Sequence, residues 1–243
     1  MISKSQLKYI QSLGQKKHRD EEEVFIAEGP KLVNELLQSN NAELSHLFAV
    51  HEWLEKNEEL LLKKNVTEIN QAALGKISQL KTPNQVLGVF KKFKTAPLTV
   101  ENRISLALDG IQDPGNMGTI IRTADWFGIS QIICSSDCAD IYNPKVVQAT
   151  MGSIARVSVV YTNLSEWLSQ QKSIRIYAAV LQGKDVTKMN AIKEGLVIIG
   201  NESKGIHEDL LQFANEKITI PKKGNADSLN VAVATGIILS YLS

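Results

Sequence analysis

The second half of the chain alternates short apolar runs with amphipathic segments, and this pattern constrains the fold more than any other feature. The apolar runs have strand length and occupy residues 104–109, 131–136, 155–161, 175–181, 196–200 and 217–221. Segments with apolar residues three or four positions apart lie between or after them, at 116–127, 144–151, 163–171, 206–213 and 228–242. Continuously apolar strands separated by amphipathic helices predict an α/β fold, with a parallel sheet covered on both faces.

The first part of the chain predicts a smaller α/β unit. Strand-like runs occupy residues 24–29, 44–50 and 85–93, and helical patterns occupy 3–13, 52–64, a segment beginning near Pro30 and a short one near 70–76. A polar stretch that contains Pro97 follows and is typical of a linker. We therefore predict three parts, which are a first domain at 1–95, a linker at 96–103 and a second domain at 104–243.

Composition excludes several classes of protein. The 243 residues carry a net charge of +1, and no window approaches the ~18 uninterrupted apolar residues of a membrane helix. The N-terminus is polar and has no apolar core of the kind that signals secretion. Cys134 and Cys138 are too few for a disulfide framework, and they lack the neighbouring histidines of a zinc site. We expect free thiols in a reducing cytoplasm and no metal.

Two basic stretches stand out in this nearly neutral chain. Residues 1–19 and 76–94 contain no acid, and their cations are Lys4, Lys8, Lys16, Lys17, Arg19, Lys76, Lys81, Lys91, Lys92 and Lys94. Charge alone favours ordinary solvated lysines. The alternative is a single basic patch in the folded protein, which would suit a phosphate backbone.

Three polar loops in the second domain share one character. Residues 109–124, 197–206 and 220–242 each begin at the end of a predicted strand and mix glycine, asparagine and small hydroxyl residues. Ligands of open α/β sheets bind outside the carboxyl ends of the strands, so these loops are expected to converge on one site. The common nucleotide motifs are excluded, because Gly200 and Gly205 are not followed by the Lys-Ser of a phosphate-binding loop and the earlier glycines have the wrong spacing for a dinucleotide fold.

In order and spacing, the three loops resemble the motifs of the SpoU/TrmH branch of the SPOUT superfamily, the S-adenosylmethionine-dependent RNA ribose 2′-O-methyltransferases. The segment KKHRDEEEVFIAEGPKLVNELL, at 16–37, resembles the small substrate-recognition domain of that family. The resemblance implies a C-terminal SPOUT domain with a deep trefoil knot, in which the C-terminal chain passes through an earlier loop. It also implies S-adenosyl-L-methionine as cofactor, RNA as substrate, and a homodimer with the active site at the subunit interface.

Carried over position by position, the resemblance implies a set of site residues. The catalytic set is Asn116, Arg122, Glu202, Ser228 and Asn230, and the cofactor-binding set is Leu181, Gly200, Ile220 and Leu229, mainly through backbone groups. We expect RNA contacts at Lys16, Lys17 and Arg19, together with Arg122.

Each of these side chains also has an ordinary structural interpretation. Arg122 follows Ile121 in an apolar run, where an unpaired charge would be costly, but it could be a salt-bridged helix arginine. Asn116 and Ser228 could merely cap helices, whereas Asn230 falls inside the first turn of the predicted last helix. Glu202 could be a surface turn acid. The residues interpreted as ordinary packing or surface residues are His46, His51, His207, Trp53, Trp126 and Trp167.

The predicted function is methyl transfer from S-adenosylmethionine to a ribose 2′-hydroxyl of structured RNA, with ribosomal RNA expected before tRNA. Two alternatives stay open: a SPOUT enzyme that methylates a base, and an inactive RNA-binding protein with the same fold. The last predicted helix, 228–242, is apolar on more than one face, so a partner subunit is expected to cover part of it. Ile238 is the position at which a charge is expected to break this homodimer.

Overall fold

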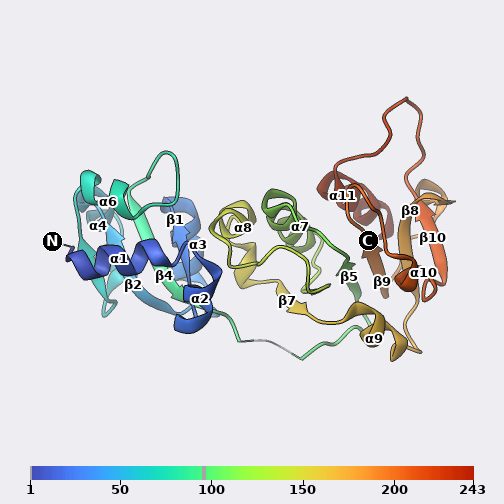
Figure 1. Cartoon of the computed structure of the whole chain (residues 1–243), viewed down its shortest axis with the longest axis horizontal. Helices are drawn as coiled ribbons and strands as arrows, with labels where there is room; N and C mark the ends of the chain where they lie inside the picture. Colours follow the sequence, from blue (N-terminus) through green and yellow to red (C-terminus); the bar gives the residue numbers. More distant parts are fainter. Residues whose placement is uncertain (1, 95–96) are drawn as a thin grey trace. The chain divides into compact units, whose positions relative to one another are not determined.

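The computed structural model describes residues 2–94 and 97–243, and the chain divides into two compact units (Figure 1). The N-terminal unit comprises Met1–Lys94 together with Asp140–Ala155, and the C-terminal unit comprises Thr95–Ala139 together with Arg156–Ser243. The predicted boundary between the first domain and the linker, at residues 95–96, lies outside the described residues. Across the described chain, no helix is both long and apolar enough to cross a membrane.

The N-terminal unit is built on a four-stranded sheet in the order β1-β4-β2-β3. Its strands are β1 (Val24–Glu28), β2 (Leu44–Ala49), β3 (Val66–Glu68) and β4 (Val86–Lys91). Strand β4 runs antiparallel to β1 and β2, and β3 runs parallel to β2. Alternate residues of β1 face opposite sides, so that Phe25 joins one apolar core and Ile26 joins the other.

Helices cover this sheet largely where the periodicity predicts them. They are α1 (Lys4–Ser12), α2 (Lys16–Glu22), α3 (Pro30–Gln38), α4 (His51–Glu55), α5 (Glu58–Leu61) and α6 (Gln71–Ile77). Helix α2 is not predicted, because its sequence KKHRDEE has no apolar period. It ends where Glu23 adopts a left-handed conformation with φ 52°.

One element of the N-terminal unit comes from far along the sequence. Helix α8 (Pro144–Thr150) and the short helix η1 (Ser153–Ala155) place Val147, Ile154 and Ala155 in the core that contains Phe25. The predicted helix at 144–151 is present, but it packs in the N-terminal unit, which differs from a second domain that is continuous over 104–243. The chain therefore passes between the two units three times.

The C-terminal unit contains the predicted parallel sheet, with six strands in the order β10-β8-β9-β5-β6-β7. All strand pairs are parallel. The strands are β5 (Ile104–Leu108), β6 (Gln131–Cys134), β7 (Ser158–Tyr161), β8 (Ile176–Asp185), β9 (Gly195–Ile199) and β10 (Glu216–Thr219). Each of the six apolar runs forms a strand, so the predicted fold class is confirmed. The trefoil knot stays a prediction.

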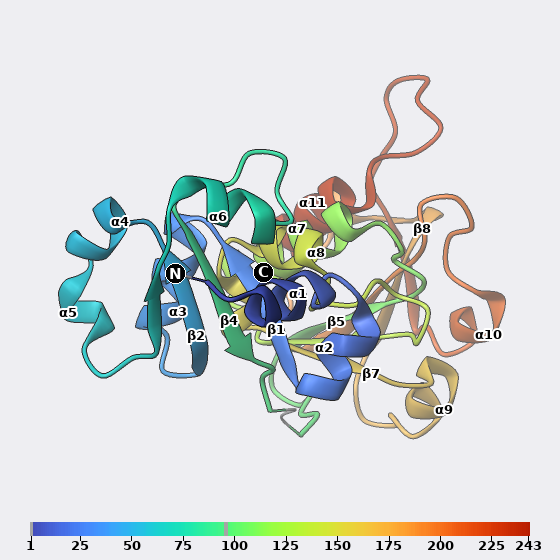
Figure 2. The same cartoon turned by 60° about the vertical axis from the view of Figure 1, so that its left-hand side comes forward.

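The remaining helices of this unit are α7 (Pro114–Trp126), α9 (Leu164–Ser169), α10 (Glu208–Leu211), α11 (Val231–Leu242) and the short η2 (Val186–Lys188). Helix α11 packs beside α7, with Gly236 close to Thr123 (Figure 2). Helix α11 begins after Asn230, so the predicted start at residue 228 is wrong. The helical pattern of the sequence extends back to residue 228, but residues 228–230 are not helical. The segment between β10 and α11 makes a long excursion away from the sheet (Figure 1).

Candidate functional site

The polar loops of the C-terminal unit gather at one edge of its sheet. Because all six strands are parallel, their carboxyl ends lie along the same edge. Residues 109–113 follow β5, residues 200–207 follow β9, and residues 220–230 follow β10. These loops contain half of the sequence-predicted site residues, which are Gly200, Glu202, Ile220, Ser228, Leu229 and Asn230.

Asn116 links the three loops through its side-chain amide. Its Nδ2 donates to Oε1 of Glu202 over 2.6 Å, and its Oδ1 accepts from Nδ2 of Asn230 over 2.8 Å. Glu202, Asn116 and Asn230 therefore form one hydrogen-bonded chain, which we call the polar relay. The structure thus brings three of the five predicted catalytic residues together.

Local helix chemistry positions two members of the relay. Asp113 caps α7 by accepting a hydrogen bond of 2.8 Å from the Asn116 N–H, and Pro114 occupies the first helical position, where its missing N–H costs nothing. Asn230 is the cap of α11, and its Oδ1 accepts from the N–H groups of Ala232 and Val233. The expectation that Asn230 lies inside the first turn is therefore wrong. Its side chain fixes the helix start with one end and Asn116 with the other.

A tight loop after β9 carries Glu202. The backbones of Asn201 and Gly205 exchange two hydrogen bonds of 2.9 Å, so the loop closes on itself. A Cβ at Gly200 would lie 2.3 Å from the carbonyl carbon of Gly205, so only glycine fits where the two backbone segments meet. Glu202 lies at the tip, half-buried, with its carboxylate turned to Asn116.

Arg122 is exposed, so the argument from a charge inside an apolar run is wrong. Residues 120, 121 and 124 of α7 are buried, whereas Thr119, Arg122 and Trp126 lie on the solvent face three and four positions apart. Among the described residues, the Arg122 guanidinium has no ion-pair or hydrogen-bond partner. Ser228 is likewise exposed, in the loop before α11. Neither side chain is used by the fold, so both can contact a ligand.

Three of the four predicted cofactor residues lie on or directly after adjacent strands. Gly200 directly follows β9, Ile220 directly follows β10, and Leu181 lies within β8, the strand between them. Oγ1 of Thr219, the last residue of β10, donates to the backbone oxygen of Leu181 over 3.1 Å, which joins β10 to β8 beside Ile220. Leu181 is 77% exposed and Leu229 is 45% exposed. Exposed apolar side chains beside irregular backbone suit a purine and its ribose, so these residues fit S-adenosylmethionine.

The sequence analysis missed a second polar pair at this edge. Asp109 follows β5 and is 2% exposed, and both of its carboxylate oxygens lie 2.9 Å from Nδ1 of His207. The His207 N–H donates to the same carboxylate over 2.8 Å. This hydrogen bond to Asp109 raises the pKa of His207. His207 is exposed, as its interpretation as an ordinary surface residue implies, but that interpretation missed its contact with Asp109. An aspartate placed directly after a buried strand marks Asp109 as a candidate, although nothing local identifies His207 as its partner.

The two cysteines are free thiols, as expected, and lie near the same edge. The Sγ of Cys138 accepts a hydrogen bond of 3.2 Å from the N–H of Ile111. A hydrogen bond from the Cys134 thiol lowers the pKa of Cys138 to about 7, whereas burial raises the pKa of Cys134. Among the described residues, no group of three or more His, Cys, Asp or Glu side chains could hold a metal ion.

The predicted RNA contacts of the N-terminal unit fall into two kinds. Lys16 and Lys17 are exposed. Arg19 is 2% exposed, and its guanidinium donates to the carbonyls of Leu13 and Gly14 and to Oδ2 of Asp140, at 2.9, 2.9 and 2.7 Å. Arg19 is therefore a structural ion-pair residue, and the expectation that it contacts RNA is wrong.

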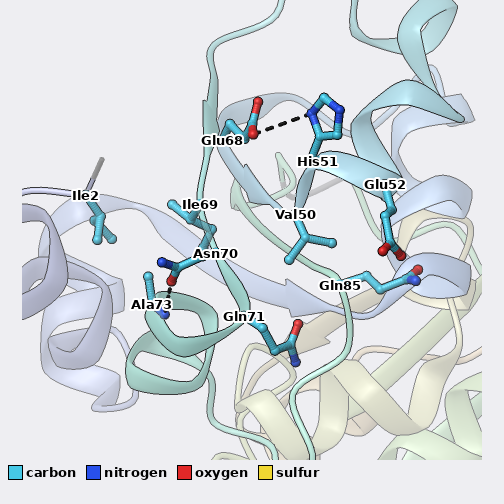
Figure 3. A pocket seen from close by; sticks show the side chains of 10 residues that line it. All are labelled: Ile2, Val50, His51, Glu52, Glu68, Ile69, Asn70, Gln71, Ala73 and Gln85. Atoms are coloured by element: carbon cyan, nitrogen blue, oxygen red, sulfur yellow. Dashed lines mark hydrogen bonds and ion pairs between the residues drawn. The ribbon is translucent and has the colours of Figure 1, made fainter.

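The N-terminal unit has a hollow of about 830 Å³ at the ends of β2 and β3 (Figure 3). Val50 and Ile69 supply apolar lining, and Nδ1 of His51 lies 3.4 Å from Oε1 of Glu68. Asn70 accepts from the N–H of Ala73 and so caps α6. The hollow contains none of the predicted site residues.

Comparisons with known proteins agree with the site. Residues 103–240 match the family model described as the SpoU rRNA Methylase family, and residues 4–88 match the MRM3-like substrate binding domain. The Bacillus subtilis protein named 23S rRNA (guanosine(2553)-2′-O)-methyltransferase RlmP is 32% identical, over 93% of this chain and 91% of its own length.

Solved structures give the same result. An AdoMet-bound rRNA methyltransferase from Sinorhizobium meliloti is 33% identical with a TM-score of 0.87, over 99% of this chain and 95% of that chain. A TrmH-family protein from Porphyromonas gingivalis, described as an RNA methyltransferase, is 34% identical with a TM-score of 0.85, over 99% of this chain and 98% of its own. Together with the three joined loops, these matches show that the chain belongs to the SpoU rRNA methylase family.

Proposed function

We propose that this protein transfers a methyl group from S-adenosylmethionine to a ribose 2′-hydroxyl of ribosomal RNA. The observation that carries the proposal is the polar relay, in which Glu202, Asn116 and Asn230 join three loops of a SpoU-family domain. The B. subtilis relative is named for 2′-O methylation of a guanosine in 23S rRNA, which supports ribose in rRNA over a base or tRNA.

Leu181, Gly200, Ile220 and Leu229 would hold the cofactor, which supplies a methyl group activated by its positive sulfur. The polar relay holds its amide and carboxylate groups in fixed directions before RNA arrives, so none has to reorganise during the reaction. Positioning of the ribose hydroxyl against the methyl group is the main source of rate in such a transfer.

Arg122 and Ser228 complete the proposed site from its open side. A guanidinium stays protonated in proteins and presents five donors, which suits an RNA phosphate. Arg122 is exposed and unpaired among the described side chains, so phosphate binding would not break an existing contact. We assign Arg122 to holding the phosphate of the target nucleotide, and Ser228 to the substrate hydroxyl.

Recognition of structured RNA is assigned to the N-terminal unit. Its exposed cations include Lys4, Lys8, Lys16, Lys17, Lys76, Lys81 and Lys94. RNA affinity is expected to fall steeply with salt, because phosphate contacts release counterions. Replacing Lys16 and Lys17 together by alanine is expected to weaken RNA binding and flatten its salt dependence, with S-adenosylmethionine binding unchanged. If RNA affinity and its salt dependence stay at wild-type values, these lysines are not part of the RNA surface.

A cytoplasmic homodimer is the proposed assembly. Trp126 on α7 is 85% exposed, and Val233 and Tyr241 on the neighbouring α11 are 52% and 43% exposed. Large apolar side chains gathered on two packed helices are typical of a surface covered by a partner. Ile238 is 2% exposed within the monomer, so the expectation that a charge there would break the dimer contact is wrong. A charge at this position would disrupt the core of the monomer instead.

Methylation mapping tests the function. Ribosomal RNA from a strain without the gene should lack one ribose methyl group that the parent strain has, and the gene should restore it. Loss of a base methyl group instead would select the base-methylating alternative. A protein that binds RNA but gives no calorimetric signal with S-adenosylmethionine would select the inactive RNA-binding alternative.

A further inference from the structure

The Asp109–His207 pair lies outside the polar relay, and it constrains the loop that carries Glu202. Asp109 is fixed at the end of β5, where its N–H donates to the carbonyl of Ile199 over 2.9 Å. Its carboxylate is almost fully buried and accepts both the backbone N–H and Nδ1 of His207. A buried carboxylate is costly without such partners, so the contact is a strong constraint on His207.

The loop that carries Glu202 is fixed on both sides to consecutive residues of one strand end. Before Glu202, Nδ2 of Asn201 donates to the carbonyl of Gly110 over 2.7 Å. After Glu202, His207 is held by Asp109. Between these two anchors, Oδ1 of Asn201 accepts the N–H groups of Ser203 and Lys204 at 2.9 and 3.1 Å. The tip of the loop therefore has little freedom to move.

The same strand end leads directly to the other side of the relay. Residues 111–113 continue from Gly110 into the cap of α7, and Asn116 lies in the first turn of that helix. The position of Glu202 relative to Asn116 is thus set by one short stretch of backbone that both anchors contact. We propose that Asp109 and His207 are a positioning pair, which holds the loop after β9 so that Glu202 reaches Asn116. The methyl-transfer test of this role rests on the proposed function, whereas the NMR test does not.

Charge favours the protonated imidazole in this pair. Besides Asp109, the acids that act on His207 are Asp137, from the loop after β6, and Asp209, on α10. All three favour the imidazolium, and the hydrogen bond to Asp109 contributes most to the raised pKa. The stability that the charged pair gives to the folded protein is complete below the ordinary histidine pKa of about 6.5. It is lost as pH rises through the raised pKa of His207.

Two substitutions separate the side chain from the backbone contact. His207→Ala removes the imidazole but keeps the backbone N–H that donates to Asp109, so the loop retains one anchor. Asp109→Asn keeps an acceptor oxygen of the same shape but removes the negative charge. Lys204→Ala is the matched control, because Lys204 belongs to the same loop and its exposed side chain has no partner among the described residues.

The first readout is NMR and needs no RNA. In the wild-type protein, the imidazole of His207 should titrate above pH 6.5, and Asp109→Asn should return its pKa toward 6.5. His207→Ala should shift the Asn116 side-chain amide signals, which report the bond to Glu202, whereas Lys204→Ala should leave them unchanged. A wild-type His207 pKa at or below 6.5, or unchanged Asn116 signals in His207→Ala, would overturn the proposal whatever the protein's activity.

The second readout is methyl transfer. His207→Ala should lower kcat by about tenfold or more, since small displacements in a positioned site have effects of this size, and should leave the Kd for S-adenosylmethionine unchanged. In a Glu202→Ala background the same substitution should cause little further loss, because the contact with Asn116 that His207 is proposed to position is already absent. A full additional loss would refute the positioning role. A wild-type protein inactive on rRNA would instead count against the proposed function. The NMR results would still test whether Asp109 and His207 position the loop.

Discussion

The Glu202 carboxylate accepts a hydrogen bond of 2.6 Å from the side-chain amide of Asn116, which lies 86 residues earlier in the sequence. A carboxylate can only accept, so this contact orients the amide, with Nδ2 toward Glu202 and Oδ1 toward Asn230. Asn230 in turn caps α11 with its own oxygen. The amide of Asn116 is therefore held at both ends before any ligand is present.

The relay predicts that Asn116 cannot be replaced by a residue of the same shape. Asn116→Asp places a carboxylate against Glu202, so repulsion should separate the loops and lower kcat by about 100-fold or more, as when an oriented donor is removed from an active site. Gln112→Ala, an exposed change in the same loop, should leave kcat unchanged. Steady-state methyl transfer decides between these outcomes, and wild-type turnover in Asn116→Asp would show that the relay has no catalytic part.

Arg122 should be required for catalysis but dispensable for folding. Its guanidinium is exposed and unpaired among the described residues, so Arg122→Ala should leave Tm within about 1 °C of wild type, as expected for a surface change. Methyl transfer should be abolished while calorimetry still detects S-adenosylmethionine. If the turnover rate is unchanged, Arg122 leaves the set of catalytic residues.

Arg19 should behave in the opposite way. Its guanidinium is buried against Asp140, and removing one member of a buried ion pair costs about 3–5 kcal/mol of unfolding free energy. Arg19→Ala should therefore lower the urea midpoint strongly. Lys17→Ala, which removes an exposed pair with Glu21, should change the free energy of unfolding by less than about 1 kcal/mol. An Arg19→Ala protein of normal stability that binds RNA poorly would restore Arg19 as an RNA contact.

The dimer surface should lie on the solvent faces of α7 and α11. Trp126→Glu introduces a charge where the monomer has an 85% exposed side chain, so it should preserve folding and break a dimer. Ile238→Glu places a charge in the monomer core and should unfold the protein instead. Light scattering should give about twice 26.8 kDa for the wild type and about 26.8 kDa for Trp126→Glu. A wild-type monomer with full activity would exclude the dimer.

Much of the fold could be predicted because burial leaves a direct mark on sequence. The inner strands β5, β6 and β9 are buried on both faces or nearly so, and each shows as a largely apolar run, whereas the edge strands β7 and β10 are only partly buried. Helix α2 left no such mark, because its buried residue is Arg19, which is stabilised inside by carbonyls and Asp140. Hydrophobic periodicity therefore does not reveal a packed helix whose buried residue is a paired charge.

The site was less accessible to sequence analysis. An apolar run around Arg122 suggested burial, but a helix turns 100° per residue and puts that position on the outer face. Asn230 marks the true start of α11, which hydrophobic periodicity alone places too early. The pairing of Asp109 with His207 joins strand ends whose neighbourhood depends on the strand order, and nothing local to either residue specifies it.

The central claim is that the three joined loops methylate a ribose of ribosomal RNA. The most direct test incubates the purified protein with S-adenosylmethionine carrying a labelled methyl group and ribosomal RNA from a strain that lacks the gene. The RNA is then digested to nucleosides for mass spectrometry. We predict label on the ribose of one nucleoside, with label accumulating far more slowly when Asn116→Asp replaces the wild type. Label on a base, or wild-type protein that transfers no label, would contradict the account.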